Sequence, residues 1–281
     1  MLNSHPHIAA PPECGFLQWW HTKYGDWSGE DRRDAEKIEA FARDVLQSKK
    51  METWDLTEDV LIDALEAARP ESYGDACSVV YQVWHHQAEY QRGEAETVPL
   101  KAIVDKNNYY VNHLEAIDSV WPEARYIFLT RDGLDVAASY KGLQEIETDS
   151  PYAPDLPTSI PEIATEWVAN NERVIAFLRS KPSTRWVRVR YEDVIRSPEK
   201  HLRELMHLLE VPYQKRVESY YTHNDEPEAT LDWKRRTLQP PDPSRIGRYQ
   251  EALTAEEITA FKETAEPMLD QLGYLAPSQG D

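Results

Sequence analysis

The sequence contains little cysteine, no long apolar run and few positive charges for its length. Its two cysteines, Cys14 and Cys77, cannot build a disulfide framework or a CxxC pair, so we expect a reducing, cytoplasmic location. No stretch reaches the ~18 apolar residues that a membrane helix needs, and no basic-then-apolar leader opens the chain. Lys and Arg number 31 against 50 Asp and Glu, a formal charge of −19. Nucleic acids and anionic membranes bind basic faces, so we expect neither as a partner.

The 281 residues suffice for one domain with a sizeable apolar core. Nine Trp, fifteen Tyr and five Phe supply apolar area, which argues against disorder. No repeat, low-complexity tract or interdomain linker interrupts the chain, so we expect a single domain over 1–281. A chain this acidic can hold an anionic ligand only where its few cations are concentrated locally.

Helical periodicity dominates the region 30–93. Apolar residues recur on one face of 30–48, and residues 55–58 resemble a capping box that opens a second helix. A third helix is expected over about 75–90. These helices precede the parallel-strand signals and are predicted to form a helical insertion.

Strands and helices alternate in the rest of the chain. The predicted strands are 99–104, 125–130 and 185–190. The helical patterns between and after them are 108–120, 134–143, 162–179, 198–209 and 254–272. This alternation predicts an α/β fold with a parallel sheet flanked by helices. The proline-rich loop 151–161 is longer than a simple connector, and we interpret it as a lid.

Polar clusters follow all three predicted strands. They are Asp105-Lys106-Asn107, Arg131-Asp132-Gly133 and Tyr191-Glu192-Asp193. Ligands of open parallel sheets bind beyond the carboxyl ends of the strands, so these clusters are predicted to mark a site. The alternative for each cluster is a solvated strand end or an ion pair.

Arg131 and Ser139 form a second candidate feature. Arg131 is predicted at a strand end, and Ser139 about two turns into the next helix. A guanidinium fork and a hydroxyl placed in this way can converge on one phosphate. In the alternative, Arg131 pairs with Asp132 or Asp135, and Ser139 is a small packing residue.

At these residues the sequence resembles the sulfotransferases that use 3′-phosphoadenylyl sulfate (PAPS). Residues 126–139, YIFLTRDGLDVAAS, resemble the family's strand-turn-helix for the 3′-phosphate. Residues 190–198, RYEDVIRSP, resemble its RYEDL-x-P segment, and 244–249, SRIGRY, resemble its carboxyl-terminal S-x-x-G-R-W pattern before LGY. The match runs in the family's order from about residue 99 to 274. Within the family, the sequence most resembles the branch of the bacterial and tyrosylprotein-type enzymes.

The resemblance implies a fold like that of the P-loop nucleotide hydrolases, and it also bears on the start of the chain. In the family, a strand and a P-x-S-G-T-T-type loop precede a helix that ends in L-x-x-H-P-x-I. Residues 1–8, MLNSHPHI, resemble the end of that helix. We therefore expect the first strand and the 5′-phosphosulfate loop to be missing. A misassigned start codon, a truncated chain and a non-catalytic remnant each explain such a gap.

The resemblance implies roles for two catalytic residues. Glu13 matches the glutamate that acts as general base in the tyrosylprotein-type branch, and His21 is an alternative base. Lys106 matches the family's lysine that stabilises charge on the transferring sulfuryl group. Asn107 and Asn108 replace the usual Thr-Pro or Asp-Pro, which puts the turn after Lys106 in question.

The resemblance also implies a donor site. Arg131 and Ser139 are expected to hold the 3′-phosphate, Tyr191 to contact the adenine or 3′ side, and Arg248 to be the last donor ligand. Between residues 232 and 248 there are five Lys or Arg and two Asp, a local excess of positive charge. Ser244 or Thr237 is a candidate hydroxyl donor to the phosphosulfate.

The predicted function is sulfuryl transfer from PAPS to a hydroxyl or phenol, with no metal. His5, His7, His85 and His86 are interpreted as surface histidines. A non-catalytic sulfotransferase-like binding protein is the main alternative. A nucleotide-dependent phosphotransferase is the weaker one, because no G-x-x-x-x-G-K-[ST] occurs. Small molecules, saccharides and peptides all remain possible acceptors, and Trp19 and Trp20 are candidates to line the acceptor pocket. We expect acceptor selectivity in the helical region 30–93 and the proline-rich loop.

Overall fold

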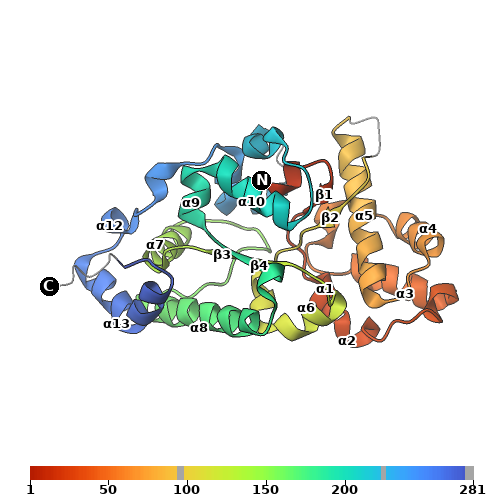
Figure 1. Ribbon diagram of the computed structural model, residues 1–281, viewed down its shortest axis with the longest axis horizontal. Helices are drawn as coiled ribbons and strands as arrows, with labels where there is room; N and C mark the ends of the chain where they lie inside the picture. The colour runs from red at the N-terminus through yellow and green to blue at the C-terminus, as the bar shows by residue number, and fades with distance from the viewer. Residues whose placement is uncertain (94–97, 223–225, 276–281) are drawn as a thin grey trace. The chain divides into compact units, whose positions relative to one another are not determined.

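The computed structural model describes residues 1–93, 98–222 and 226–275, and the chain forms two compact units (Figure 1). Unit 1 contains Met1–Ala124 and Leu209–Pro227, and unit 2 contains Arg125–Leu208 and Glu228–Asp281. The single domain over 1–281 stays a prediction, because two compact units can belong to one domain.

Unit 1 is mostly helical. Its α-helices are α1 (Phe16–Trp19), α2 (His21–Tyr24), α3 (Ala35–Leu46), α4 (Glu58–Ala68), α5 (Tyr73–Gln91) and α6 (Leu114–Val120). Its 3₁₀ helices are η1 (Leu2–Ser4), η2 (Asp31–Arg33), η3 (Met51–Trp54), η4 (Asn108–Asn112) and η6 (Lys215–Thr222). Its strands are β1 (Ile8–Ala9) and β2 (Ala102–Ile103).

Unit 2 combines a strand pair with longer helices. Its strands are β3 (Tyr126–Thr130) and β4 (Trp186–Arg190). Its α-helices are α7 (Gly133–Leu143), α8 (Ile160–Arg179), α9 (Tyr191–Arg196), α10 (Pro198–Leu208), α11 (Leu231–Lys234), α12 (Tyr249–Ala252) and α13 (Ala255–Gln271). Its 3₁₀ helices are η5 (Ser183–Arg185), η7 (Glu228–Thr230), η8 (Arg235–Leu238) and η9 (Pro243–Arg245).

Both strand pairs are parallel, which confirms the predicted α/β class. β1 pairs with β2, and β3 pairs with β4 from Tyr126 opposite Trp186 to Thr130 opposite Arg190. Within the described residues the strands form two separate pairs, where the sequence predicted one sheet. The strand β1 has only two residues, so it leaves no periodic signal in the sequence.

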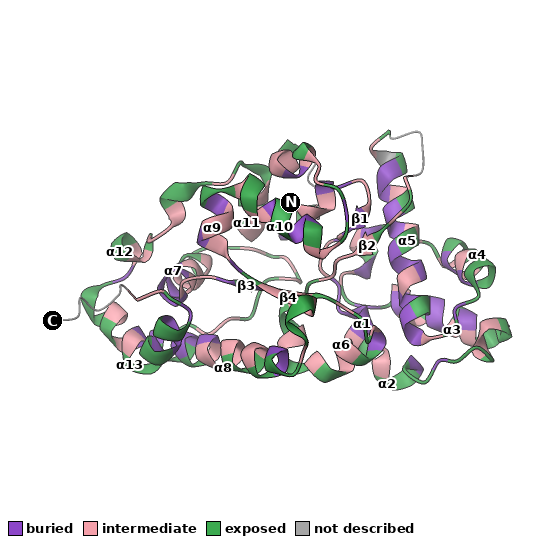
Figure 2. Cartoon of the chain, viewed as in Figure 1, coloured by how far each residue is buried: buried purple, intermediate pink, exposed green. Residues whose placement is uncertain are grey.

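The core of unit 1 is built from aromatic side chains of α1, α3, η3 and α5. Phe16 packs edge-on against Trp54 and tilted against Tyr81, with ring centroids 5.9 and 5.4 Å apart. Phe41 makes edge contacts with Tyr24 and Trp27. Figure 2 shows the buried residues along α5 and α3. The predicted helical region 30–93 therefore supplies much of this unit's apolar core.

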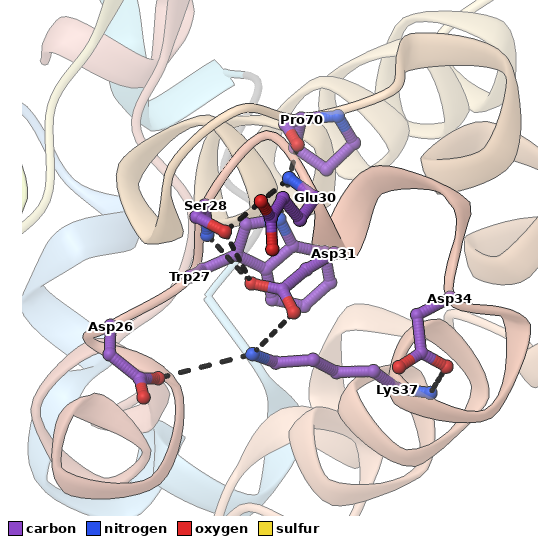
Figure 3. A network of polar contacts seen from close by, with 8 residues as sticks. All are labelled: Asp26, Trp27, Ser28, Glu30, Asp31, Asp34, Lys37 and Pro70. Atoms are coloured by element: carbon purple, nitrogen blue, oxygen red, sulfur yellow. Dashed lines mark hydrogen bonds and ion pairs between the residues drawn. The ribbon is translucent and has the colours of Figure 1, made fainter.

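A polar network surrounds the entry to α3 (Figure 3). Lys37 Nζ lies 3.0 Å from an Asp31 oxygen and 3.9 Å from an Asp26 oxygen. Its ammonium also lies 5.4 Å from the centroid of the Trp27 ring. The Asp34 side chain accepts the Lys37 backbone N–H at 3.1 Å, which caps the helix. These contacts fix where α3 begins.

The predicted capping box at residues 55–58 is wrong, although a helix follows it. Asp55 has a left-handed backbone conformation with φ of 56° and ends η3. The helix α4 begins at Glu58, with Thr57 as its N-cap. The predicted final helix is confirmed as α13, which Thr254 and Glu257 open with a capping box.

The helices α8 and α13 pack against each other in unit 2 through Trp167 and Phe261, whose ring centroids are 6.0 Å apart. Gly133 begins α7 directly beside these two rings. A Cβ at Gly133 would lie 2.7 Å from the Phe261 ring, so only glycine permits this approach. The start of α7 is therefore fixed against the core of unit 2.

Within the described residues, no helix is both long and apolar enough to cross a membrane.

The prediction that the four histidines are surface residues is wrong for His5 and His85, which are buried. His5 accepts the His7 backbone N–H at its Nδ1, and its Nε2 lies 2.7 Å from the Pro212 carbonyl oxygen. His85 is 1% exposed on α5, and its Nε2 has no hydrogen-bond partner among the residues that the structure describes. Burial, with a smaller contribution from the neighbouring His86, lowers the pKa of His85 to about 4. His85 is therefore held in the neutral form.

We predict that His85 makes the stability of the protein depend on pH. Its folded pKa, about 4, lies below the ordinary value near 6.5, so the unfolded chain takes up the proton first as the pH falls. His85 costs the folded protein no stability above about pH 6.5. The free energy of unfolding then falls as the pH drops from 6.5 to 4, because only the unfolded chain binds the proton there. His85→Gln should therefore reduce the fall in unfolding free energy between about pH 7.5 and 5 by about 2 kcal/mol.

Urea unfolding at both pH values measures this difference. His113→Gln is the matched control, because His113 is exposed in the same unit, and it should keep the wild-type pH dependence. Equal pH dependence in His85→Gln and the wild type would contradict the prediction.

Candidate functional site

Two predicted site residues of unit 2, Arg131 and Tyr191, follow the paired ends of β3 and β4. Thr130 and Arg190 are the last register pair of these strands, and Arg131 and Tyr191 come directly after them. The Arg131 guanidinium lies 4.9 Å from the centroid of the Tyr191 ring. The sequence expectation that these two strand ends share one edge is confirmed.

A buried carboxylate joins the two strand ends below this edge. Glu192, 3% exposed, accepts the Asp132 backbone N–H at 2.9 Å and the Tyr274 hydroxyl at 3.2 Å. The Tyr274 hydroxyl also lies 3.2 Å from Thr130 Oγ1, and its ring lies 4.4 Å from the Arg190 guanidinium. Burial raises the pKa of Tyr274 to about 12, so its hydroxyl keeps its proton. This network fixes the backbone on which Arg131 stands.

Neither aspartate beside Arg131 forms an ion pair with it among the described residues. Asp132 accepts the Leu134 backbone N–H at 2.9 Å and caps α7. Burial, with smaller contributions from the charges of Asp135 and Glu192, raises the pKa of Asp132 to about 6. Asp135 is 2% exposed and accepts two backbone N–H groups of the segment 247–249. The alternative of a local Arg131–aspartate pair is therefore wrong.

Asp135 attaches the predicted carboxyl-terminal motif to α7. Its carboxylate accepts the N–H of Gly247 at 2.8 Å and of Tyr249 at 3.0 Å. Gly247 has φ of +78°, a conformation that favours glycine, and Arg248 lies between the two donors. Ser139 is four residues after Asp135, so it lies on the same face of α7. The structure thus brings the segment of Arg248 to the helix face that carries Ser139.

Four guanidinium groups gather at this place. Burial lowers the pKa of Arg245, and the nearby charges of Arg236, Arg248 and Arg131 lower it further. None of the four forms an ion pair with a carboxylate in the described part of the chain, but Asp242 lies near two of them. Hydrogen bonds from Ser244, and then the charges of Arg245 and Arg236, lower the pKa of Asp242. We call Arg131, Arg236, Arg245 and Arg248 the arginine cluster.

The arginine cluster has the chemistry of an anion site. Arg131 Nε is buried and has no hydrogen-bond partner among the described residues, so its N–H can donate to a ligand. Arg131 and Arg245 are half-buried and Arg236 and Arg248 are exposed, so repulsion among the four charges acts mainly on the two half-buried groups. A phosphate would satisfy several of their N–H donors and remove the repulsion.

The two hydroxyl groups suggested for the phosphosulfate are already engaged. Ser244 Oγ donates to Asp242 at 2.6 Å, and Thr237 Oγ1 donates to the Lys234 carbonyl at 2.8 Å. Each of these bonds lies within a single turn of backbone. Neither hydroxyl is therefore directed to a ligand in this conformation.

The two predicted catalytic residues lie together in unit 1. Lys106 Nζ is 3.9 Å from a Glu13 carboxylate oxygen, and Lys50 Nζ is 3.6 Å from the same oxygen. The Glu13 side chain is 16% exposed and the Lys106 side chain 65% exposed. The residues come from a turn after β1 and a turn after β2. The parallel pairing of these strands explains why they meet.

The other residues named around Glu13 differ in exposure. His21 Nε2 lies 2.9 Å from Ser119 Oγ, and its ring packs against Tyr73. Trp20 donates its indole N–H to Ser48 Oγ at 2.8 Å and packs against Tyr24. Trp19 is 40% exposed and its indole covers Gly15. Of the two tryptophans, Trp19 is thus the more accessible to an acceptor.

Sequence reasoning did not identify two important residues of unit 2. Arg245 was noted only as a letter of the 244–249 motif, and Asp135 only as a partner for Arg131. A signal for Asp135 exists, because an acidic residue in the first turn of a helix can bind nearby backbone N–H groups. No group of three or more metal-ligating side chains occurs among the residues that the structure describes.

Comparison with known proteins identifies the family and the fold. A family model described as the sulfotransferase family matches residues 1–215. The structure is similar to the sulfotransferase domain from the curacin biosynthetic pathway, with a TM-score of 0.62, 18% identity and coverage of 98% of this chain and 92% of that one. It is also similar to the sulfotransferase domain of the Synechococcus PCC 7002 olefin synthase, with a TM-score of 0.57, 19% identity and coverage of 98% and 89%. No curated protein matches the sequence. The chain belongs to the sulfotransferase family.

Proposed function

We propose that the protein transfers a sulfuryl group from PAPS to a hydroxyl or phenol acceptor. The observation that carries this proposal is the arginine cluster, four guanidinium groups without a carboxylate partner among the described residues. PAPS carries a 3′-phosphate and a 5′-phosphosulfate, so its negative charge matches these guanidinium groups.

In this proposal, unit 2 binds the donor through its 3′-phosphate. Arg131 donates to this phosphate from its buried Nε, and Ser139 donates its hydroxyl. Ser139 lies on the same face of α7 as Asp135, which binds residues 247–249. Arg245 and Arg248 add positive charge from the segment that Asp135 binds. Tyr191, already stacked on Arg131, contacts the adenine or the 3′ side of the nucleotide.

In this proposal, Glu13 and Lys106 catalyse the sulfuryl transfer step. Glu13 accepts the proton of the acceptor hydroxyl as its oxygen attacks sulfur, and the bond from sulfur to the 5′-phosphate oxygen breaks. The electron pair of that bond stays on 3′,5′-ADP. Lys106 stabilises the charge that develops on the transferring group and the leaving oxygen. As in phosphoryl transfer, most of the rate comes from positioning and electrostatics.

The acceptor remains one of three classes: small molecules, saccharides and peptides. We propose that the helical region 30–93 and the proline-rich loop select it, with the exposed Trp19, six residues after Glu13 in the chain, as one contact. The proposed location is the cytoplasm, as the two reduced, buried cysteines allow.

The main rival function is a sulfotransferase-like protein that binds a ligand without turnover. Titration of 3′,5′-ADP, followed by incubation with radiolabelled PAPS and a panel of phenols, saccharides and tyrosine peptides, separates the two. A longer form that includes any codons upstream of Met1 is tested in parallel. Binding with transfer in either form supports the enzyme, and binding without transfer in both supports the rival. Transfer that needs Mg²⁺ and ATP would identify a phosphotransferase instead.

We predict that Arg131→Ala weakens 3′,5′-ADP binding about 10- to 100-fold. The change removes a charge-assisted hydrogen bond, which contributes about 1.5–3 kcal/mol. Isothermal titration calorimetry measures the dissociation constant. Arg203→Ala is the matched control, because it removes the same charge from unit 2 at an exposed Arg203–Glu199 pair on α10. Equal affinities of the two variants would contradict the role of Arg131.

We predict that Glu13→Gln lowers transfer to the acceptor about 10²- to 10⁴-fold, the usual contribution of a general base. The affinity for 3′,5′-ADP should stay within about twofold, because the amide keeps the side-chain volume and Glu13 does not hold the nucleotide. Glu39→Gln, exposed on α3, is the control for the lost charge. Wild-type turnover in Glu13→Gln would assign the base to another residue, with His21 the first to test.

A further inference from the structure

Asp105 is the residue directly before Lys106, and its carboxylate receives three hydrogen bonds. One oxygen accepts the Tyr81 hydroxyl at 2.6 Å and also the Tyr110 hydroxyl. The other oxygen accepts the backbone N–H of Lys106 at 2.7 Å. Burial raises the pKa of Asp105, while the hydrogen bonds from Tyr110, Tyr81 and the Lys106 N–H favour its charged form, in which it accepts all three.

The donors reach Asp105 from two different elements of unit 1. Tyr81 lies in the middle of α5, fully buried, and its ring packs against Phe16, Trp54 and Trp121. Tyr110 lies in η4, which begins two residues after Lys106. The carboxylate therefore ties the turn after β2 to the aromatic core of the unit.

Asp105 also lies close to the turn that carries Glu13. The pKa of the Cys14 thiol is raised to about 12, mainly by burial, and the charge of Asp105 contributes to this rise. Cys14 follows Glu13 directly, and the Trp54 indole N–H donates to the Pro12 carbonyl at 3.0 Å on the other side. The backbone on both sides of Glu13 is thus held by the same core that holds Asp105.

We propose that Asp105 is a positioning residue for sulfuryl transfer, which holds the backbone of Lys106 so that its ammonium stays beside Glu13. This inference rests on the function proposed above. It also explains how the turn forms without the usual Thr-Pro or Asp-Pro after the lysine. Asn107 caps η4 by accepting the Tyr109 N–H at 2.9 Å, and Asp105 fixes the residue before it.

The test compares Asp105→Asn with a matched variant elsewhere in unit 1. Asp44 accepts the Tyr24 hydroxyl at 2.6 Å and pairs with Lys23 at 2.6 Å, so Asp44→Asn removes a similar carboxylate away from the lysine turn. Tyr110→Phe is the milder variant if Asp105→Asn folds poorly, and Tyr24→Phe is its control. Circular dichroism and thermal unfolding establish that each variant is folded.

The readouts are kcat for transfer of label from PAPS to the acceptor found in the panel, the dissociation constant of 3′,5′-ADP and amide hydrogen exchange over 102–110. Asp105→Asn should lower kcat about 10- to 100-fold and speed exchange at Lys106, while nucleotide affinity changes less than about twofold. Tyr110→Phe should change kcat and exchange in the same direction by a smaller factor. The Asp44 and Tyr24 variants should leave all three readouts near wild type.

Two results would overturn the inference. The first is an equal loss of kcat in Asp105→Asn and Asp44→Asn, since a general loss of stability would then explain both. The second is unchanged amide exchange at Lys106 in Asp105→Asn and Tyr110→Phe. If the wild-type protein transfers no label, the proposed function fails, and the exchange measurement alone decides whether Asp105 holds this turn.

Discussion

Repulsion among four guanidinium groups is the constraint on which the candidate donor site depends. The charges of Arg131, Arg236 and Arg248 all act on the half-buried Arg245, and no carboxylate forms an ion pair with the four in the described chain, although Asp242 lies near Arg236 and Arg245. Like charges around a half-buried group raise the free energy of the folded protein unless an anion joins them. The site is therefore arranged to favour a polyanionic ligand. A formal charge of −19 does not prevent this, because the field at a site depends on the nearest groups.

Buried carboxylates hold this arrangement together by binding backbone and hydroxyl donors. Glu192 joins the ends of β3 and β4, and Asp135 fixes residues 247–249 to α7. In unit 1, Asp105 holds the turn of Lys106 in a related manner. Each of these acids directs its oxygens mainly to backbone or hydroxyl donors, although Glu192 also lies 3.9 Å from Arg190 Nε. Asp135 and Asp105 thus position segments that carry positive side chains by binding backbone N–H groups.

Much of the fold could be predicted because its signals are local. The strands β3 and β4 are continuous β-rich runs, and α13 has helical periodicity up to its end at Gln271, shortly before Gly273. The strand β1 could not be predicted, since its two residues pair with β2 more than ninety positions later in the chain. The capping box at 55–58 failed because Asp55 takes a left-handed conformation at the end of η3. A local sequence pattern does not show which backbone conformation a single residue such as Asp55 adopts.

The candidate site was predictable to a similar degree. Arg131 and Tyr191 follow recognisable strands, so the rule for parallel sheets placed them at one edge. The gathering of Arg236 and Arg245 depends on tertiary contacts of irregular segments, which carry no periodicity. The role of Asp105 depends on Tyr81, twenty-four residues earlier on another element. Pairings of this kind become visible only in three dimensions.

The most direct measurement is the affinity of the protein for 3′,5′-ADP compared with its regioisomer 2′,5′-ADP, which carries the same charge. If the arginine cluster with Ser139 forms a site for a 3′-phosphate, 3′,5′-ADP should bind at least about tenfold more tightly, a difference of about 1.4 kcal/mol. Equal affinity for the two isomers would contradict a defined 3′-phosphate site and leave only unspecific attraction of anions.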